Sequence, residues 1–206
     1  MARVEFFFDC SSPWTYLAFS QIEHICKKAS AQLDLKPILV GGIFNKINQE
    51  VYETRANPHP VKGKYYVKDL QDWANYAGLK IGMPSVFPVR AVTMMRMAIV
   101  AQEEGCLPAF AKACFEAYWG DLKDVGQDDV LLEICAALSL NGPDILARAK
   151  SDEVKAQLAA NTQEVMDRGG FGSPTIFVDG DDMYFGNDRL SLLAHRLGLD
   201  TSFRRA

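Results

Sequence analysis

The stretch of sequence that decides the fold is Val4–Leu17, which reads VEFFFDCSSPWTYL. Its first part, Val4–Phe8, is rich in β-branched and aromatic residues and predicts a buried strand. Ser12-Pro13 then predicts the start of a helix, because serine is a favoured N-cap and proline is favoured in the first turn. A second strand is predicted over Leu33–Val40. The chain therefore opens with a β-α-β unit.

The other end of the chain returns to strand patterns. Thr175–Val178 and Met183–Phe185 are two short strand-like runs, and the Asp179-Gly180 step between them is a strong turn signal. A final helix is predicted to start at Asn187-Asp188 and to end at Gly198. This half therefore reads β-β-α.

The middle of the chain is almost entirely helical in pattern from Tyr65 to about Gly169, and residues 41–62 are expected to form a loop. Asp128 or Asp129 is expected to cap one of the middle helices. The layout is that of a thioredoxin-like α/β fold with an all-helical domain inserted between its β-α-β and β-β-α halves. The predicted domains are residues 1–42 with 170–206 for the thioredoxin-like part, and residues 43–169 for the insertion.

Composition limits the possible functions. The chain has 206 residues, of which 49% are hydrophobic and 23% charged, with a net charge of −4. A mildly acidic chain offers no electrostatic surface for nucleic acid or for an anionic membrane. We expect neither partner, no membrane-spanning segment and no signal peptide.

The five cysteines are odd in number and form no C-x-x-C pair, which indicates a reduced, intracellular protein. We therefore expect a cytoplasmic location. The three histidines His24, His59 and His195 do not cluster, and no metal site is expected.

Three short motifs have simple structural explanations when each is taken alone. Ser12-Pro13 is an N-cap with a first-turn proline, Ser173-Pro174 is a turn with a proline before a strand, and Asn187-Asp188 is a helix N-terminus with a favourable acidic residue. Their order along the chain and their places in the layout together favour a functional interpretation.

With these motifs the sequence resembles the 2-hydroxychromene-2-carboxylate isomerases and the related kappa-class glutathione transferases, in the DsbA-like branch of thioredoxin folds. The most specific parts are FDCSSPWTYLA, from residue 8, and GFGSPTIFVDGDDMYFGNDRL, from residue 170. The isomerases read Gly-Asn-Asp-Arg where the kappa transferases read Gly-Ser-Asp-Arg. This chain has Gly186-Asn187-Asp188-Arg189, as the isomerases do.

The resemblance implies a glutathione site. Ser12 would contact the sulfur of bound glutathione, at the position where related oxidoreductases carry a nucleophilic cysteine. Pro13 and Trp14 would complete this helix start. The main chain of Ser173, before a cis Pro174, would pair with the cysteinyl part. Asn187 and Asp188 would hold the γ-glutamyl end.

Lys62 and Asn57 are weaker candidates for the same site. Lys62 resembles a Lys-Gly step of the kappa transferases and could reach a carboxylate, although it could equally be a solvated lysine. Asn57 matches a kappa-class asparagine only if a gap is introduced. By sequence position alone, Trp14 and the residues around Phe87–Arg90 could face an aromatic acid, with Arg90 as its carboxylate partner.

The main functional hypothesis is glutathione-dependent isomerisation of 2-hydroxychromene-2-carboxylate and trans-o-hydroxybenzylidenepyruvate, with a thiolate activated by Ser12. The substrate would be a small aromatic acid or another electrophile, and the resemblance implies a homodimer. Two alternatives stay open, a kappa-like transferase or peroxidase and a non-catalytic glutathione-binding domain. A dithiol oxidoreductase is disfavoured, since Ser12 and Thr15 occupy the two reactive positions.

Several positions depart from the family pattern. Ser11 stands where many members carry a bulky apolar residue, and it places a second hydroxyl beside Ser12. Phe185 stands where the isomerases often carry tryptophan. Cys10 lies two residues too early for the nucleophile position, and we expect it to pack at the end of the first strand.

Overall fold

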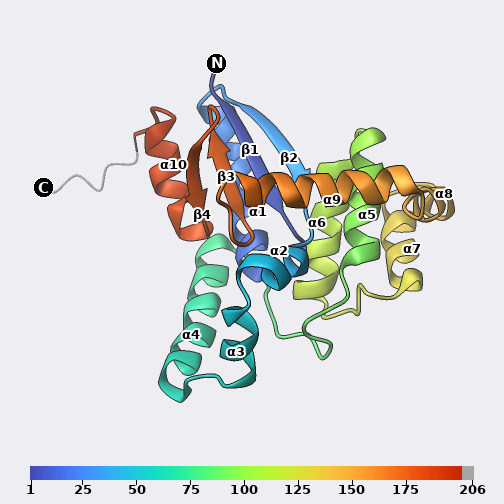
Figure 1. Ribbon diagram of the computed structural model, residues 1–206, viewed down its shortest axis with the longest axis horizontal. Coiled ribbons are helices and arrows are strands. Elements are labelled where there is room, and N and C mark those ends of the chain that lie inside the picture. The colour runs from blue at the N-terminus through green and yellow to red at the C-terminus, as the bar shows by residue number, and fades with distance from the viewer. Residues whose placement is uncertain (201–206) are drawn as a thin grey trace, which may run out of the picture.

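The computed structural model describes residues 1–200. At its centre lies a four-stranded sheet of order β2-β1-β3-β4 (Figure 1). Strand β1 pairs in parallel with β2 and antiparallel with β3, which in turn pairs antiparallel with β4. The strands are β1 (Arg3–Phe8), β2 (Gln32–Pro37), β3 (Thr175–Val178) and β4 (Asp182–Phe185). Distant parts of the chain therefore meet in one sheet, and the predicted thioredoxin-like fold class is confirmed.

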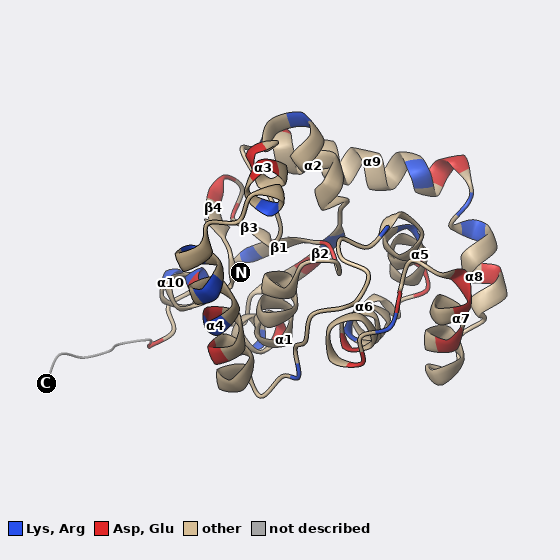
Figure 2. Ribbon diagram, turned by 90° about the horizontal axis from the view of Figure 1, so that it is seen from below, with Lys and Arg blue, Asp and Glu red and all other residues tan. Residues whose placement is uncertain are grey.

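Helices surround this sheet and extend away from it. They are α1 (Pro13–Lys28), α2 (Val40–Ile47), α3 (Glu50–Ala56), α4 (Pro60–Ala77), α5 (Val92–Glu103), α6 (Leu107–Phe115), α7 (Asp128–Ala137), α8 (Gly142–Arg148), α9 (Asp152–Asp167) and α10 (Leu190–Arg196). A π-helical turn η1 (Glu116–Gly120) extends α6, and a 3-10 turn η2 (Asn187–Arg189) precedes α10. Figure 2 shows α2, α3 and α9 on one side of the sheet and α1, α4 and α6 on the other.

Strand β1 explains how both faces of the sheet are covered. Its alternate residues Val4, Phe6 and Phe8 point into the larger core that includes α1. Phe7 points the other way, where it meets Phe177 edge-on at 5.7 Å and joins a smaller core with residues of α2 and α9. Because both faces are apolar, β1 is buried along almost its whole length.

Helix α9 belongs to the predicted insertion, yet it packs on the sheet. Asn161 donates a hydrogen bond to the carbonyl of Pro37, and Lys36 pairs with Glu164 at 2.7 Å. The predicted boundary between residues 42 and 43 falls within α2. The domain division at these positions stays a prediction, and the last predicted residues, 201–206, lie outside the described chain.

The structure corrects three local predictions. Strand β2 ends at Pro37 rather than at residue 40, because proline has no amide for the ladder and the Val40 amide donates to Asp9. The predicted loop over 41–62 contains α2, α3 and the start of α4. Helix α4 begins at Pro60, so that Lys62 lies in its first turn rather than before it.

The predicted aspartate cap is also wrong. The residue at the N-cap of α7 is Gln127, and its side chain makes no capping hydrogen bond. Asp128 and Asp129 lie in the first turn instead, where their charge still favours the helix N-terminus. No helix among residues 1–200 has the length and apolar character needed to cross a membrane.

Candidate active site

Ser12 occupies the N-cap of α1, as predicted from the Ser-Pro step. Its backbone is extended, with φ −106° and ψ 123°, and Pro13 takes the first helical position. The hydroxyl oxygen accepts the Thr15 amide at 3.2 Å and donates to the Ser173 carbonyl at 3.2 Å. Ser12 is half-buried. Its hydroxyl lies at the positive end of a 16-residue helix and beside the main chain of Ser173.

Beneath Ser12, buried hydroxyl groups join α1 to the segment before β3. The Thr15 and Ser173 hydroxyls are 2.8 Å apart, and the Asp9 amide donates to the Ser173 hydroxyl at 3.0 Å. Thr15 is fully buried and Ser173 almost so. These bonds tie the start of α1 to Ser173, whose position relative to Ser12 is therefore defined by side chains as well as by the sheet.

The Asp9 carboxyl group determines the shape of the loop that leads into α1. It is fully buried, and its oxygens accept the amides of Ser11 and Val40, both at 2.8 Å. Burial raises the pKa of Asp9, and these hydrogen bonds oppose that rise. The Ser11 side chain lies close enough to this carboxyl group to help lower its pKa. Ser11 therefore faces Asp9, whereas Ser12 faces Ser173, which separates the two neighbouring hydroxyls.

The peptide bond between Ser173 and Pro174 is cis, as predicted. The Pro174 carbonyl accepts the Gly186 amide at 3.1 Å, which brings the residues after β4 next to this proline. Asn187 and Asp188 follow directly in η2. Three motifs that are up to 176 residues apart in sequence (12 to 188) thus lie in one region of the fold.

Asn187 and Asp188 differ in exposure. Both line a cavity of about 480 Å³ between α1, α4 and the start of α10. The Asn187 side chain is buried, and its amide nitrogen has no hydrogen-bond partner among the described residues. Asp188 is exposed and pairs with Arg189. An unpaired buried donor beside an exposed carboxylate is a natural site for a ligand that carries both an acceptor and a cation.

Trp14 links the site to α4. Its indole donates to the Tyr66 hydroxyl at 2.6 Å, and the two rings meet edge-on at 5.4 Å. Lys62 is exposed one turn before Tyr66, and Asn57 is the exposed C-cap of α3. Within the described chain neither side chain makes a hydrogen bond or ion pair with Ser12, Ser173 or Asn187, so their predicted roles stay predictions.

Cys10 lies two residues before Ser12 but is fully buried. Its amide faces the Met95 sulfur at 3.4 Å, and its thiol lies 3.9 Å from the Ala111 carbonyl. Burial raises the pKa of the Cys10 thiol well above its ordinary range. A thiol in these surroundings stays protonated and packs as a small hydrophobe, in agreement with the sequence prediction.

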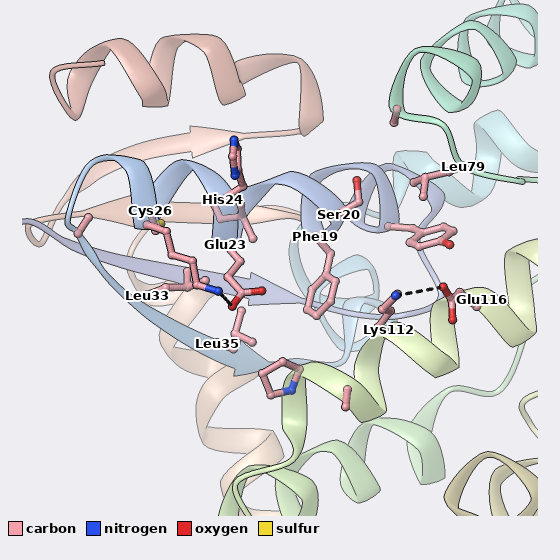
Figure 3. A pocket seen from close by; sticks show the side chains of 17 residues that line it. Phe19, Ser20, Glu23, His24, Cys26, Leu33, Leu35, Leu79, Lys112 and Glu116 are labelled. Carbon is pink, nitrogen blue, oxygen red and sulfur yellow. Dashed lines mark ion pairs between the residues drawn. The ribbon is translucent and has the colours of Figure 1, made fainter. Parts of the chain in front are cut away.

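A separate groove of about 900 Å³ runs along α1, β2 and α6 (Figure 3). Phe19, Leu33 and Leu35 line its apolar part, and the Lys112–Glu116 ion pair lies at its edge (Figure 3). Ser12, Ser173 and Asn187 do not line this groove. Its size alone therefore does not make it the reactive site.

Sequence reasoning missed three residues that shape the site. They are Asp9, whose buried carboxyl holds the loop, Thr15, which bonds Ser173, and Tyr66, which bonds Trp14. Asp9 lies three residues before Ser12 and Thr15 three residues after it. Polar residues on both sides of a predicted helix start could have indicated that they support the site. Nothing local marks Tyr66, because its partner lies 52 residues away.

The fold and the site define a thioredoxin-type chain with a hydroxyl group, rather than a cysteine, at the start of its first helix. The chain belongs to the family of DSBA-like thioredoxin domains, whose family model matches residues 3–198.

Two curated relatives indicate which branch of the family is close. A 2-hydroxychromene-2-carboxylate isomerase of Sphingobium xenophagum is 24% identical over 196 residues, covering 92% of this chain and 95% of the relative. The human glutathione S-transferase kappa 1 is 26% identical over 208 residues, covering 95% of this chain and 90% of the relative. Full-length relatives of both kinds are therefore enzymes.

A solved structure of a 2-hydroxychromene-2-carboxylate isomerase superposes with a TM-score of 0.80 at 24% identity, covering 95% of this chain and 94% of that structure. At this identity the superposition shows a shared fold. It includes the helical segments as well as the sheet, because nearly the whole of both chains is covered.

Proposed function

We propose that this chain is a glutathione-dependent isomerase of the type that interconverts 2-hydroxychromene-2-carboxylate and trans-o-hydroxybenzylidenepyruvate. The observation that supports it best is the Ser12 hydroxyl, half-buried at the N-terminus of α1 and in contact with the Ser173 carbonyl. When bound, glutathione supplies a nucleophilic thiolate that adds reversibly to a conjugated double bond.

The residues present fit glutathione at both of its ends. Ser12 carries a hydroxyl donor at the positive end of α1, where negative charge on sulfur is favoured. Asn187 offers a buried donor that has no partner among residues 1–200, which suits a carboxylate, and Asp188 offers an acceptor for an ammonium group. The Ser173 carbonyl accepts from the Ser12 hydroxyl, and the carbonyl of the next residue, Pro174, accepts the Gly186 amide directly before Asn187.

The role of Ser12 is to hold negative charge. A charge-assisted hydrogen bond is worth about 1.5–3 kcal/mol. If Ser12 redirects its proton from the Ser173 carbonyl to a thiolate, that energy lowers the thiol pKa by about one to two. A serine forms no disulfide, so the chain itself cannot oxidise its ligand at this position.

The direct test is an interconversion assay on chromene carboxylate, with and without glutathione. We expect turnover only with glutathione, and a loss of about 10- to 100-fold in Ser12→Ala. Ser11→Ala is the matched control, since the Ser11 side chain faces Asp9 instead. Equal loss in both variants, or turnover without glutathione, would contradict the proposal.

A kappa-like transferase or peroxidase is the alternative that the relatives favour equally, since their identities of 24% and 26% do not separate the two activities. The Gly186-Asn187-Asp188-Arg189 sequence favours the isomerase. Conjugation of a halonitrobenzene, in the absence of isomerisation, would reverse that preference. Glutathione binding with neither activity would leave the third possibility, a non-catalytic binding domain.

Two further parts belong to the proposal, and the first of them is supported by the resemblance alone. We propose a homodimer, which sedimentation of the purified chain would test. A cytoplasmic location is proposed from the five cysteines without a C-x-x-C pair, and fractionation of cells that produce the chain would test it.

A further inference from the structure

Arg55, on α3, lies between two aromatic rings. The centre of its guanidinium group is 5.4 Å from the centroid of Phe44 on α2 and 5.2 Å from that of Phe87, in the segment before α5. A guanidinium group stacked on ring faces keeps its N–H groups at its edge, where they remain free to donate. The two rings therefore hold the group without using its hydrogen bonds.

Both rings are connected by contacts to the segments that form the Ser12 site. Phe44 lies beside Gly172, where a Cβ atom would be 3.9 Å from the Phe44 ring, and Gly172 directly precedes Ser173. On the other side, Phe87 contacts Trp119 at 6.0 Å between centroids. The Trp119 indole donates to the Cys10 carbonyl at 3.0 Å, two residues before Ser12. Arg55 therefore lies between two rings, of which Phe44 is next to the segment that contains Ser173 and Phe87 is linked through Trp119 to the segment that contains Ser12.

Among residues 1–200, Arg55 differs from most arginines in its ion pairing. Arg148 pairs with three carboxylates, and Arg168 pairs with Glu5 and Glu164. Within residues 1–200, Arg55 has no carboxylate at ion-pair distance, although its side chain is exposed. A cation that lies over two rings and has no carboxylate partner in the described part of the chain is suited to a carboxylate from outside the chain.

We propose that Arg55 binds a carboxylate at the mouth of the Ser12 site. This inference rests on the proposed function and adds to it a residue that recognises the acid group. Two carboxylates have this chemistry, that of an aromatic acid substrate and the C-terminal one of glutathione. The aromatic acid is expected, because Phe44 and Phe87 offer ring surfaces beside the guanidinium group. Arg55 then takes the part that the sequence suggested for Arg90.

The test is calorimetric binding of cinnamate and of cinnamide, its uncharged amide, to the protein saturated with glutathione. We expect the wild type to bind the acid about 10- to 100-fold more tightly than the amide, and Arg55→Gln to remove that difference. Arg55→Lys keeps the charge but loses the planar group, so it should keep a smaller preference. Arg90→Gln should keep the full preference.

A second titration compares glutathione with its C-terminal amide in the same variants. Loss of the preference for this acid in Arg55→Gln would support the proposal with the tripeptide as the source of the carboxylate. If Arg55→Gln keeps both preferences, or if Arg90→Gln removes the one for cinnamate, the inference is wrong. Its failure is separable from that of the proposed function, which a Ser12-dependent change in thiol pKa tests independently of Arg55.

Discussion

Asp9 shows, at the scale of a single residue, how the site is built from below. Its carboxyl group is surrounded by protein and receives backbone donors from two separate segments, at Ser11 and Val40. The first shapes the loop before α1, and the second sets the start of α2. One buried group therefore positions Ser12 and ends strand β2. Strand and helix patterns contain no sign of the second bond, because it is a tertiary contact between residues 31 apart, whereas the bond to Ser11 is local.

Asp9→Asn should destabilise the fold by about 1–3 kcal/mol, since an amide group can accept only on one side. Burial raises the folded-state pKa of Asp9, so the folded chain binds this proton more tightly than the unfolded chain. Wild-type stability therefore falls as pH rises from the ordinary value of 3.8 through the folded pKa, whereas asparagine does not titrate.

Urea unfolding of both proteins across this pH range measures the effect. The advantage of the wild type over Asp9→Asn should be largest at the acid end and should narrow as pH rises. If the difference in unfolding free energy between the wild type and Asp9→Asn increased with pH, the folded chain would favour the charged form of Asp9.

At the scale of elements, the strands and long helices could be predicted because their patterns are local. Val4–Phe8 and Thr175–Val178 are apolar runs, and Ser12-Pro13 is a strong start signal. Helix α2 was missed because it contains Gly41 and Gly42. The start of helix α4 was placed too late because its N-cap is His59, which is not among the favoured capping residues. Of the site, only the residues that belong to the three short sequence motifs could be predicted.

Two glycines provide a matched test of how closely these elements pack. A Cβ atom on Gly170 would lie 2.5 Å from a Val165 methyl and 2.9 Å from the Val165 carbonyl, while one on Gly41 would have nothing within 4 Å. Gly170→Ala should therefore cost about 1–3 kcal/mol. Gly41→Ala, inside α2, should instead stabilise by up to about 1 kcal/mol. Thermal unfolding of both variants measures this, and effects of the same sign would contradict it.

At the scale of the whole molecule, Glu5 joins the sheet to the helical part. It lies on β1, and it pairs with Lys36 on β2 at 2.9 Å and with Arg168 after α9 at 2.8 Å. Burial alone would raise the pKa of Glu5, but the hydrogen bonds from Arg168 and Lys36 outweigh it and lower the pKa. The sequence could not predict this ion-pair network, because its members are spread over 163 residues.

Glu5→Gln should cost about 1–3 kcal/mol at neutral pH, because it removes the more deeply buried of the two carboxylates that pair with Lys36 and Arg168 and leaves them only Glu164. A lowered folded-state pKa means that this stabilisation is complete above the ordinary value of 4.5 and is lost as pH falls through the folded pKa. Unfolding curves should therefore converge in acid. A deficit that persists below the folded pKa would assign the effect to packing.

The measurement that tests the central claim most directly is a pH titration of glutathione thiolate absorbance on the purified protein. Wild type, Ser12→Ala and Ser11→Ala should be compared. We expect the thiol pKa of bound glutathione to lie about one to two below that of free glutathione in the wild type and in Ser11→Ala, and to return towards the free value in Ser12→Ala. A wild type that does not bind glutathione, or that leaves its thiol pKa unchanged, would contradict the account.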